Sequence, residues 1–319
     1  MAKRRDQDFG DPIDRLFASL DAAPPGLHDV APPNPELPSG LPETLIELYA
    51  RCDGARIYGD SIEIAAAAEV VLEDGRWRFA TWEGDAIALD VRGRVWRSDA
   101  SIDDAVCEAT RLDRWLAGAV DSQAMLFDHD GEFADDVFDD DGELLLSLRE
   151  KRLRAQLKRD QGAPGPRWRL AHVLVEQGAA ENARDMLEQV VADDPAMAWA
   201  WLDLARISEK IGEMSTAIDE ARMAADAAEG LGHPQAGYFW AQLARLAVRG
   251  SDELVSAEAA TKVSLLAPTL KQAQLSGARE SLAAGDRASA EGLVALLKAV
   301  WPRDLEVLDL AKQLDPPRS

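Results

Sequence analysis

The feature that most constrains the fold is a 34-residue internal period in the second half of the chain. Leu170 and Leu204 are 34 residues apart, and so are Gly178 and Gly212. The same spacing relates Ala171 to Ala205, Ala183 to Ala217, Ala244 to Ala278, and Pro268 to Pro302. A unit of this length buries its apolar face only by stacking on its neighbours. The second half is therefore expected to be a stack of repeated units.

The residue types within the period predict a pair of helices in each unit. Small residues at the eighth and twentieth places let two helices approach closely, and a Gly between the helices permits the turn. A Pro after the second helix ends it. Two units depart from the pattern, because the third has Ser251 in place of the Gly and the second lacks its Pro.

In period and residue types, residues 164–302 resemble the tetratricopeptide repeat family. The resemblance implies four helical hairpins. The stretch "LEVLDLAKQL" that follows would be a closing helix that covers the apolar face of the last repeat.

The same resemblance implies a concave peptide-binding groove, lined by places 2, 5, 9, 12 and 13 of each repeat. The candidate groove residues are Trp168, His172, Trp199, Arg206, Lys210, Tyr238, Arg245, Arg249 and Arg279. Arg at one turn of three successive repeats predicts a basic stripe that fits a peptide bearing carboxylates. The Asn residues typical of the family's carboxylate clamps are absent. The alternative is that these bases pair with Glu176, Glu209 and neighbouring acids as ordinary surface.

The first half of the chain has a different period. Leu45, Leu48 and Tyr49 have helical spacing, and Gly54 is placed to end that helix. The stretches "RWRFATW", "DAIALDV" and "RVWRSD" alternate between "EDG", "EGD" and "RGR" turns, which predicts a meander of antiparallel strands. A second helix is predicted over residues 101–120. The fold class is therefore an α+β N-terminal domain, an antiparallel sheet with flanking helices, followed by an all-α solenoid of tetratricopeptide type.

This first domain resembles the Smi1/Knr4 (SUKH) superfamily. The matching positions are Leu41, Pro42, Asp53, Gly54, Gly84 and Asp85. The resemblance implies a protein-binding module, in bacteria often an immunity protein that blocks a toxin, without catalytic residues. The alternative is that the two Asp and Gly pairs only form tight turns.

These readings divide the chain into four segments. Residues 1–40 hold a short amphipathic helix over residues 10–20 and a proline-rich lead-in without regular elements. The SUKH-like domain follows over 41–120, an acidic linker over 121–150, and the repeat domain with its closing helix over 151–319.

Acidic residues are concentrated in the first half. The formal net charge is -23, and residues 41–150 alone carry -17 of it. Such a field disfavours nucleic acid and anionic membranes as partners and speeds encounter with a basic protein. The plainer interpretation is that the acids only keep the protein soluble.

The acids peak in "FDHDGEFADDVFDDDGE", residues 127–143, which holds nine carboxylates and no Lys or Arg. When this run is aligned with a calcium-binding loop in either of two registers, the required Gly and acids do not fall at their positions. No metal site is therefore expected. We hypothesise that this run docks, in cis or on another copy, against a basic surface such as the groove arginines. The candidate docking acids are Asp128, Asp130, Asp135, Asp136, Asp139, Asp140 and Asp141.

Catalytic motifs are not found. The four histidines show no HxxxH or HExxH spacing, and neither GxSxG nor a Gly-rich phosphate loop occurs. No cofactor and no enzymatic activity are expected. No apolar run approaches a membrane span, and two isolated cysteines suit a reducing compartment, so a cytoplasmic protein is expected. Two functions remain open: an adaptor that binds proteins and peptides, or an immunity protein that binds a basic toxin through its acidic domain.

Overall fold

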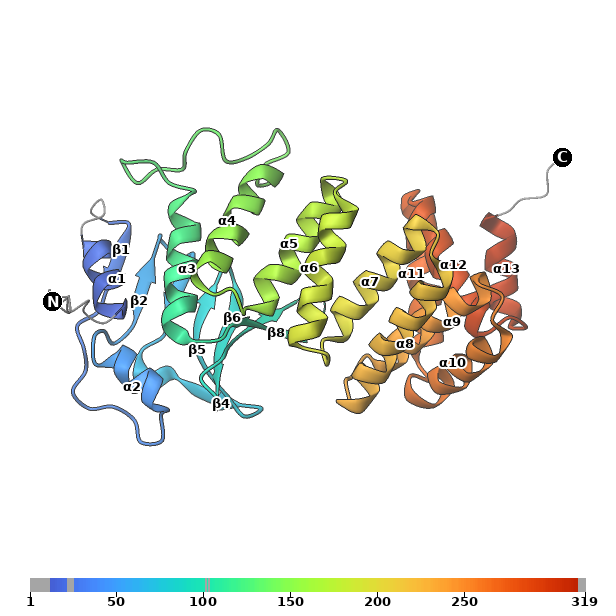
Figure 1. Cartoon of the computed structure of the whole chain (residues 1–319), viewed down its shortest axis with the longest axis horizontal. Helices are drawn as coiled ribbons and strands as arrows, with labels where there is room; N and C mark the ends of the chain where they lie inside the picture. Colours follow the sequence, from blue (N-terminus) through green and yellow to red (C-terminus); the bar gives the residue numbers. More distant parts are fainter. Residues whose placement is uncertain (1–11, 22–25, 101, 103, 315–319) are drawn as a thin grey trace, which may run out of the picture. The chain divides into compact units, whose positions relative to one another are not determined.

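The computed structural model describes residues 12–21, 26–100, 102 and 104–314. The chain forms two compact units, Met1–Ala183 and Arg184–Ser319. The first combines an antiparallel sheet with helices, and the second is helical (Figure 1). The fold class predicted from the sequence is thus confirmed.

The first unit is built on an eight-stranded sheet in which every pair is antiparallel. Its strands are β1 (His28–Val30), β2 (Ala55–Ile57), β3 (Ile62–Ile64), β4 (Val71–Glu73), β5 (Arg76–Trp82), β6 (Asp85–Asp90), β7 (Val95–Asp99) and β8 (Asp104–Ala109). The order is β1-β2-β3-β5-β6-β7-β8, and β4 pairs with β5. A short 3₁₀ helix, Ala67–Glu69, precedes β4.

Two-residue turns explain the tight hairpins of this sheet. Asp74 and Gly75 join β4 to β5, and Glu83 and Gly84 join β5 to β6. All four residues have positive φ, which two-residue hairpin loops of type I′ require. The predicted "EDG" and "EGD" turns are therefore present, and the second one fixes the position of Glu83.

The helices of the first unit are α1 (Pro12–Asp21), α2 (Glu43–Tyr49), α3 (Leu112–Ala124), α4 (Leu146–Arg159) and α5 (Pro164–Glu176), while α6 (Ala180–Asp193) continues into the second unit. Leu45 and Leu48 of α2 and Leu116 of α3 are fully buried in one core with Ile57 and Phe79 of the sheet. Helix α4 packs against α3 (Figure 1). The contact is close, because a Cβ at Gly118 would lie 3.3 Å from the Cα of Gln156.

Two local predictions were wrong. Residues 101–120 do not form one helix, because Asp104–Ala109 is strand β8, paired with β7, and α3 begins only at Leu112. The proline-rich lead-in is not free of regular structure, because His28–Val30 pairs with β2. In both places cross-strand pairing outweighs the local sequence preference.

The second unit consists of consecutive helical hairpins (Figure 1). Its helices are the end of α6, then α7 (Ala198–Ile211), α8 (Met214–Gly230), α9 (Ala236–Arg249), α10 (Glu253–Leu266), α11 (Leu270–Ala284), α12 (Arg287–Val300) and α13 (Leu305–Leu314). Ala205, Ala244 and Ala278 at the eighth place are fully buried. Val307 and Leu310 of α13 complete the core at this end, as expected for a closing helix.

The two irregular repeats behave as their sequences require. Helix α8 has 17 residues, whereas α6, α10 and α12, whose repeats have the Pro, have 14 each. Ser251 has φ +61°, the left-handed conformation that Gly212 and Gly285 adopt at the same place. The turn is therefore kept in the third repeat in a backbone conformation that costs a non-glycine residue free energy.

The domain boundaries drawn from the sequence stay predictions. The first compact unit extends to Ala183 and so contains α4 and α5 together with the sheet. Helix α4 was not predicted from the sequence.

Candidate functional site

In the second unit, the candidate groove residues lie on the first helices of successive repeats, α7, α9 and α11. Arg206 Nη2 donates to Tyr238 Oη at 3.4 Å, and Arg279 Nη2 lies 3.8 Å from Glu306 Oε1. In the repeat numbering these contacts are equivalent, because each joins an Arg at place nine to place two of the following first helix. Arg206 and Arg279 therefore occupy corresponding positions on one face, which we call the first-helix face.

Arg245 points to the preceding repeat instead. Its Nη1 and Nη2 donate to the two carboxylate oxygens of Glu209 at 2.7 and 2.8 Å, and Arg249 Nη1 donates to the same carboxylate at 2.6 Å. The hydrogen bond from Arg245, its charge and the contact with Arg249 lower the pKa of Glu209. The pairing with Glu209 considered from the sequence is thus present and neutralises part of the stripe.

Several cations on this face remain open to solvent. The side chains of Arg206, Arg249 and Arg279 are 47%, 62% and 52% exposed, and Lys210 is exposed as well. Trp199, by contrast, is only 8% exposed and packs edge-on against Phe239. Trp199 is therefore mainly a core residue, and the cations are the groups that a ligand can reach.

Trp168 and His172 lie in the first unit, on α5, where their rings pack edge-on at 4.5 Å. They line a pocket of about 550 Å³ between the end of the sheet, α4 and α5, which we call the arginine pocket. Its polar walls are Glu83, Arg97, Asp99, Glu143, Arg149, Arg152, Gln156, Arg169 and His172, and its apolar walls include Trp82, Ile102, Leu144, Leu153, Trp168 and Val173.

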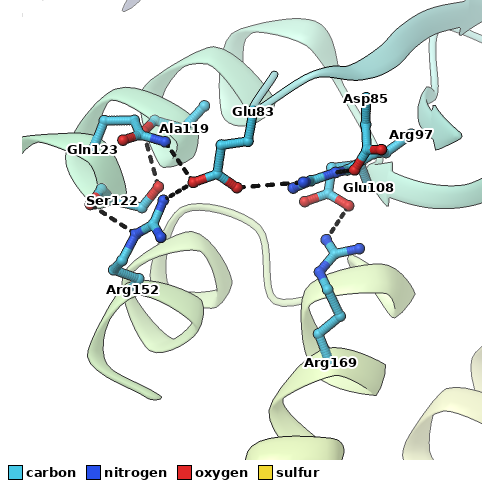
Figure 2. Close-up of polar contacts among 9 residues, drawn as sticks. All are labelled: Glu83, Asp85, Arg97, Glu108, Ala119, Ser122, Gln123, Arg152 and Arg169. Atoms are coloured by element: carbon cyan, nitrogen blue, oxygen red, sulfur yellow. Dashed lines mark hydrogen bonds and ion pairs between the residues drawn. The ribbon is translucent and has the colours of Figure 1, made fainter. Parts of the chain in front are cut away.

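Glu83, in the β5–β6 turn, is the centre of an ion-pair network at this pocket (Figure 2). Arg152 of α4 and Gln123 of α3 donate to its Oε1, and Arg97 of β7 donates to Oε2 at 3.3 Å. Arg152 also donates to the carbonyl oxygen of Ser122 at 3.2 Å. Burial alone would raise the pKa of Glu83, but the charge and hydrogen bond of Arg152, together with Arg97, lower it overall.

A second ion pair fastens α5 to the sheet. Arg169 donates to Glu108 Oε2 of β8, whose side chain is 1% exposed (Figure 2). Asp160, just after α4, accepts hydrogen bonds from the backbone N–H and hydroxyl of Thr110 at 2.6 and 2.7 Å. Buried carboxylates with charged or multiple donors hold elements rigidly, because loss of either partner leaves a polar group unpaired.

From the sequence, Trp168 and His172 were assigned to the peptide-binding groove, and that assignment stays a prediction. The arginines and carboxylates of this pocket were not predicted. The available signal was the reversal of charge from the acidic run to "REKRLRAQLKR", residues 149–159. Glu176, considered as a partner for the groove bases, instead pairs with Arg149 at 2.7 Å.

The acidic run folds into two equivalent turns, "FDHDGEF" and "FDDDGEL", eleven residues apart. Asp128 Oδ1 accepts from the backbone N–H groups of Asp130 and Glu132, and Asp139 Oδ1 accepts in the same way from Asp141 and Glu143. Backbone hydrogen bonds from Asp130 and Glu132 lower the pKa of Asp128. All seven candidate docking acids are exposed.

The aromatics between these acids attach the run to the sheet. Phe127 stacks on Tyr58 at 5.1 Å, Phe133 stacks on Phe127 at 4.8 Å, and Phe138 packs edge-on against Phe133 at 5.6 Å. Val137 is 3% exposed. The aromatics thus have a structural role within the first unit. Docking of the acids on the groove arginines stays a prediction.

A hollow of about 630 Å³ lies on the sheet. Paired residues Asp29, Arg56, Glu63, Thr81 and Ala86 form a row across five strands. The small residues Gly54, Ala65, Ala66, Ala80 and Gly84, the acids Asp53 and Glu69, and the base Arg78 also line the hollow. Small residues leave room for another chain to approach the sheet, and acids outnumber bases around the hollow.

Comparison with known proteins supports the repeat assignment. Residues 174–230 match the tetratricopeptide repeat family. Among solved structures, a structure titled MamA is 18% identical with a TM-score of 0.36, covering 53% of this chain and 90% of that one. YrrB, described as a TPR protein with an unusual peptide-binding site, is 15% identical with a TM-score of 0.33, covering 52% and 93%. A tetratricopeptide repeat protein from Parabacteroides merdae is 14% identical with a TM-score of 0.37, covering 53% and 65%.

At these TM-scores the structural likenesses add nothing to the assignment, which rests on the family match and the observed hairpins. No curated protein matches the chain. In the part of the chain that the structure describes, no helix is both long and apolar enough to cross a bilayer.

Proposed function

We propose that this protein is a non-enzymatic interaction protein whose repeats bind an acidic peptide segment of a partner. The observation that carries the proposal is the repeated contact from place nine to place two, which sets Arg206 and Arg279 on one face. Exposed guanidinium groups on one face fit an extended peptide with carboxylates, since a guanidinium can bind a carboxylate through two parallel hydrogen bonds.

The first unit would supply a second interaction, with a folded partner. Its resemblance to SUKH modules suggests protein recognition, and the hollow on the sheet is a suitable surface because it is lined by many small residues and by more acids than bases. One unit would thus recognise a protein and the other a peptide, as in an adaptor. Binding of the protein's own acidic run to the first-helix face is a variant of the same proposal.

The alternative is an immunity protein that neutralises a basic toxin. The observation in its favour is the acidic run, residues 127–143, which presents seven exposed Asp side chains without an intervening Lys or Arg. An acidic surface of this kind speeds association with a basic protein and is sensitive to salt.

Fluorescence anisotropy with labelled peptides tests the peptide proposal. A set of extended peptides rich in Asp and Glu is compared with the same peptides carrying Asn and Gln. Lys210→Ala and Arg279→Ala should each weaken binding of the acidic set about tenfold, the effect of about 1.4 kcal/mol. Arg303→Ala, an exposed base in the loop before α13, is the matched control and should leave binding unchanged.

Equal binding of acidic and amide peptides, or equal loss in all three variants, would contradict the proposal. A separate measurement tests the alternative, an immunity protein that binds a basic toxin. If the protein is an inhibitor, Asp139→Asn with Asp140→Asn and Asp141→Asn slows association with a basic protein ligand while Lys210→Ala does not.

A further inference from the structure

The interior of the first unit contains a group of buried polar atoms that take no part in the proposed interaction surfaces. Trp82 Nε1, Glu108 Oε1, Trp115 Nε1 and Gln156 Oε1 are buried and have no hydrogen-bond partner among the described residues. Each unpaired buried polar group costs free energy, so such atoms occur rarely in folded proteins. Four of them close together require an explanation.

These four residues line one small cavity of about 10 Å³. They come from four different elements: Trp82 from β5, Glu108 from β8, Trp115 from α3 and Gln156 from α4. They are 1%, 3%, 3% and 8% exposed, respectively. A cavity holds a water molecule when it offers roughly one probe sphere, about 10–15 Å³, and two to four polar partners. The cavity meets both conditions.

We propose that this cavity is a binding site for one structural water molecule. The two indole nitrogens can only donate hydrogen bonds, and the two carbonyl or carboxylate oxygens can only accept them. Water donates two hydrogen bonds and accepts two, so it matches all four atoms. A cation would face the two indole N–H groups, and an anion would face the two oxygens.

The remaining charged residues around the cavity already have partners. Asp160 accepts hydrogen bonds from Thr110 and pairs with Arg114 at 3.1 Å. The second oxygen of Glu108 accepts from Arg169. The bound species is therefore neutral and belongs to the four unpartnered atoms.

The site has a consequence for the arginine pocket. Trp82 and Gln156 line both the small cavity and the pocket. The water would link α4 to the sheet and to α3, beside the close contact at Gly118. It would thus add a polar cross-link at the floor of the pocket to the direct contacts that Arg152 makes with Glu83 and the Ser122 carbonyl.

Water-selective NOE and ROE spectra of the ¹⁵N-labelled full chain test the site at the indole N–H signals, assigned with single Trp→Phe variants. Trp82 and Trp115 should both show cross-peaks to a long-lived water. Trp199 is the matched control, because its Nε1 is equally buried and unpartnered but does not line this cavity. It should show none.

Gln156→Met removes one acceptor with little change in size and should weaken or abolish both cross-peaks. If that variant does not fold, Trp115→Phe replaces it, with loss of the Trp82 cross-peak as the expected result. The proposal is overturned if either wild-type indole lacks the cross-peak, if Trp199 shows an equal one, or if the cross-peaks persist unchanged in the folded variant.

Discussion

The two compact units differ in the contacts that chiefly hold their helices in place. In the first, α4 and α5 are attached to the sheet and α3 through ion pairs with one buried partner, Arg152 with Glu83 and Arg169 with Glu108. In the second, paired helices meet through small residues such as Ala205 and Ala244, which are fully buried. Buried ion pairs fix geometry at a desolvation cost, whereas small-residue packing permits close approach and leaves no space.

The difference implies that the two units are destabilised by different kinds of substitution. Removing one charge should weaken the first unit most, and adding volume should weaken the second most. Five substitutions, taken from the largest expected effect to the smallest, put this contrast to the test.

Arg152→Met should have the largest effect. It removes a charged donor from Glu83, which keeps Gln123 and Arg97, and it removes the hydrogen bond to the Ser122 carbonyl. Loss of one partner of a buried pair costs about 3–5 kcal/mol. Since part of Glu83 is exposed, the lower end of that range is expected. Urea unfolding of the first unit, followed by hydrogen exchange in α4, measures the change.

The matched control is Arg154→Met on the same helix. Arg154 pairs with Glu150 at the surface, so its loss should change stability by no more than about 0.5 kcal/mol. If the two substitutions are equally costly, the Glu83 network does not hold α4.

Ala244→Leu should destabilise the second unit by about 2 kcal/mol, because the added side chain has no space at the α9 interface. Thermal unfolding followed by circular dichroism is the measurement. Ala257→Leu, at an exposed position of α10, is the control and should be nearly neutral. A neutral Ala244→Leu would mean that the small residue is not required there.

Glu220→Gln should stabilise the second unit modestly at pH 7, because the neutral amide avoids the cost of burying a charge. Burial raises the pKa of Glu220, against a hydrogen bond from Ser208 and the charge of Arg184. Burial therefore makes the charged form of Glu220 less favourable in the folded protein. This penalty should be absent below the pKa of the unfolded chain, near 4.3, and should grow as pH rises through the folded pKa.

Glu83→Gln gives the opposite pH dependence in the first unit. The pKa of Glu83 is lowered, so its carboxylate stabilises the fold above the unfolded pKa and loses that effect as pH falls through the folded value. The variant should be less stable than wild type at pH 7 and approach it in acid. If the stability of both variants relative to wild type changed with pH in the same direction, the predicted contrast between the units would be wrong.

Ser251→Gly should have the smallest effect, a stabilisation of about 0.5–1 kcal/mol, because glycine tolerates the left-handed backbone at this turn. The converse, Gly285→Ser, should destabilise the fourth repeat, since Gly285 has φ +80°. Melting temperatures of both variants test the pair. A lower melting temperature for Ser251→Gly would show that the serine contributes more than its backbone strain.

The repeats could be predicted from the sequence because their determinants are local. The Gly and Pro positions fix turns and helix ends, and where the second repeat has Glu229 in place of Pro, α8 runs to Gly230. The hairpins of the sheet were equally accessible, since Asp74 with Gly75 and Glu83 with Gly84 are strong turn signals.

The arginine pocket could not be predicted, because its contacts join distant parts of the chain. Glu83 and Arg152 are 69 residues apart, and Glu108 and Arg169 are 61 apart. Strand β8 was mistaken for a helix because its strand conformation depends on pairing with β7 rather than on its own residues. The repeat of the acidic turns, by contrast, was present in the sequence as two similar seven-residue stretches.

Hydrogen exchange with the tightest-binding acidic peptide is the most direct test of the proposed peptide-binding function. We predict that saturating peptide increases protection in α7, α9 and α11, and that Arg279→Ala reduces the effect at α11. Protection confined to the acidic turns or the sheet, or no change on the first helices, would contradict it.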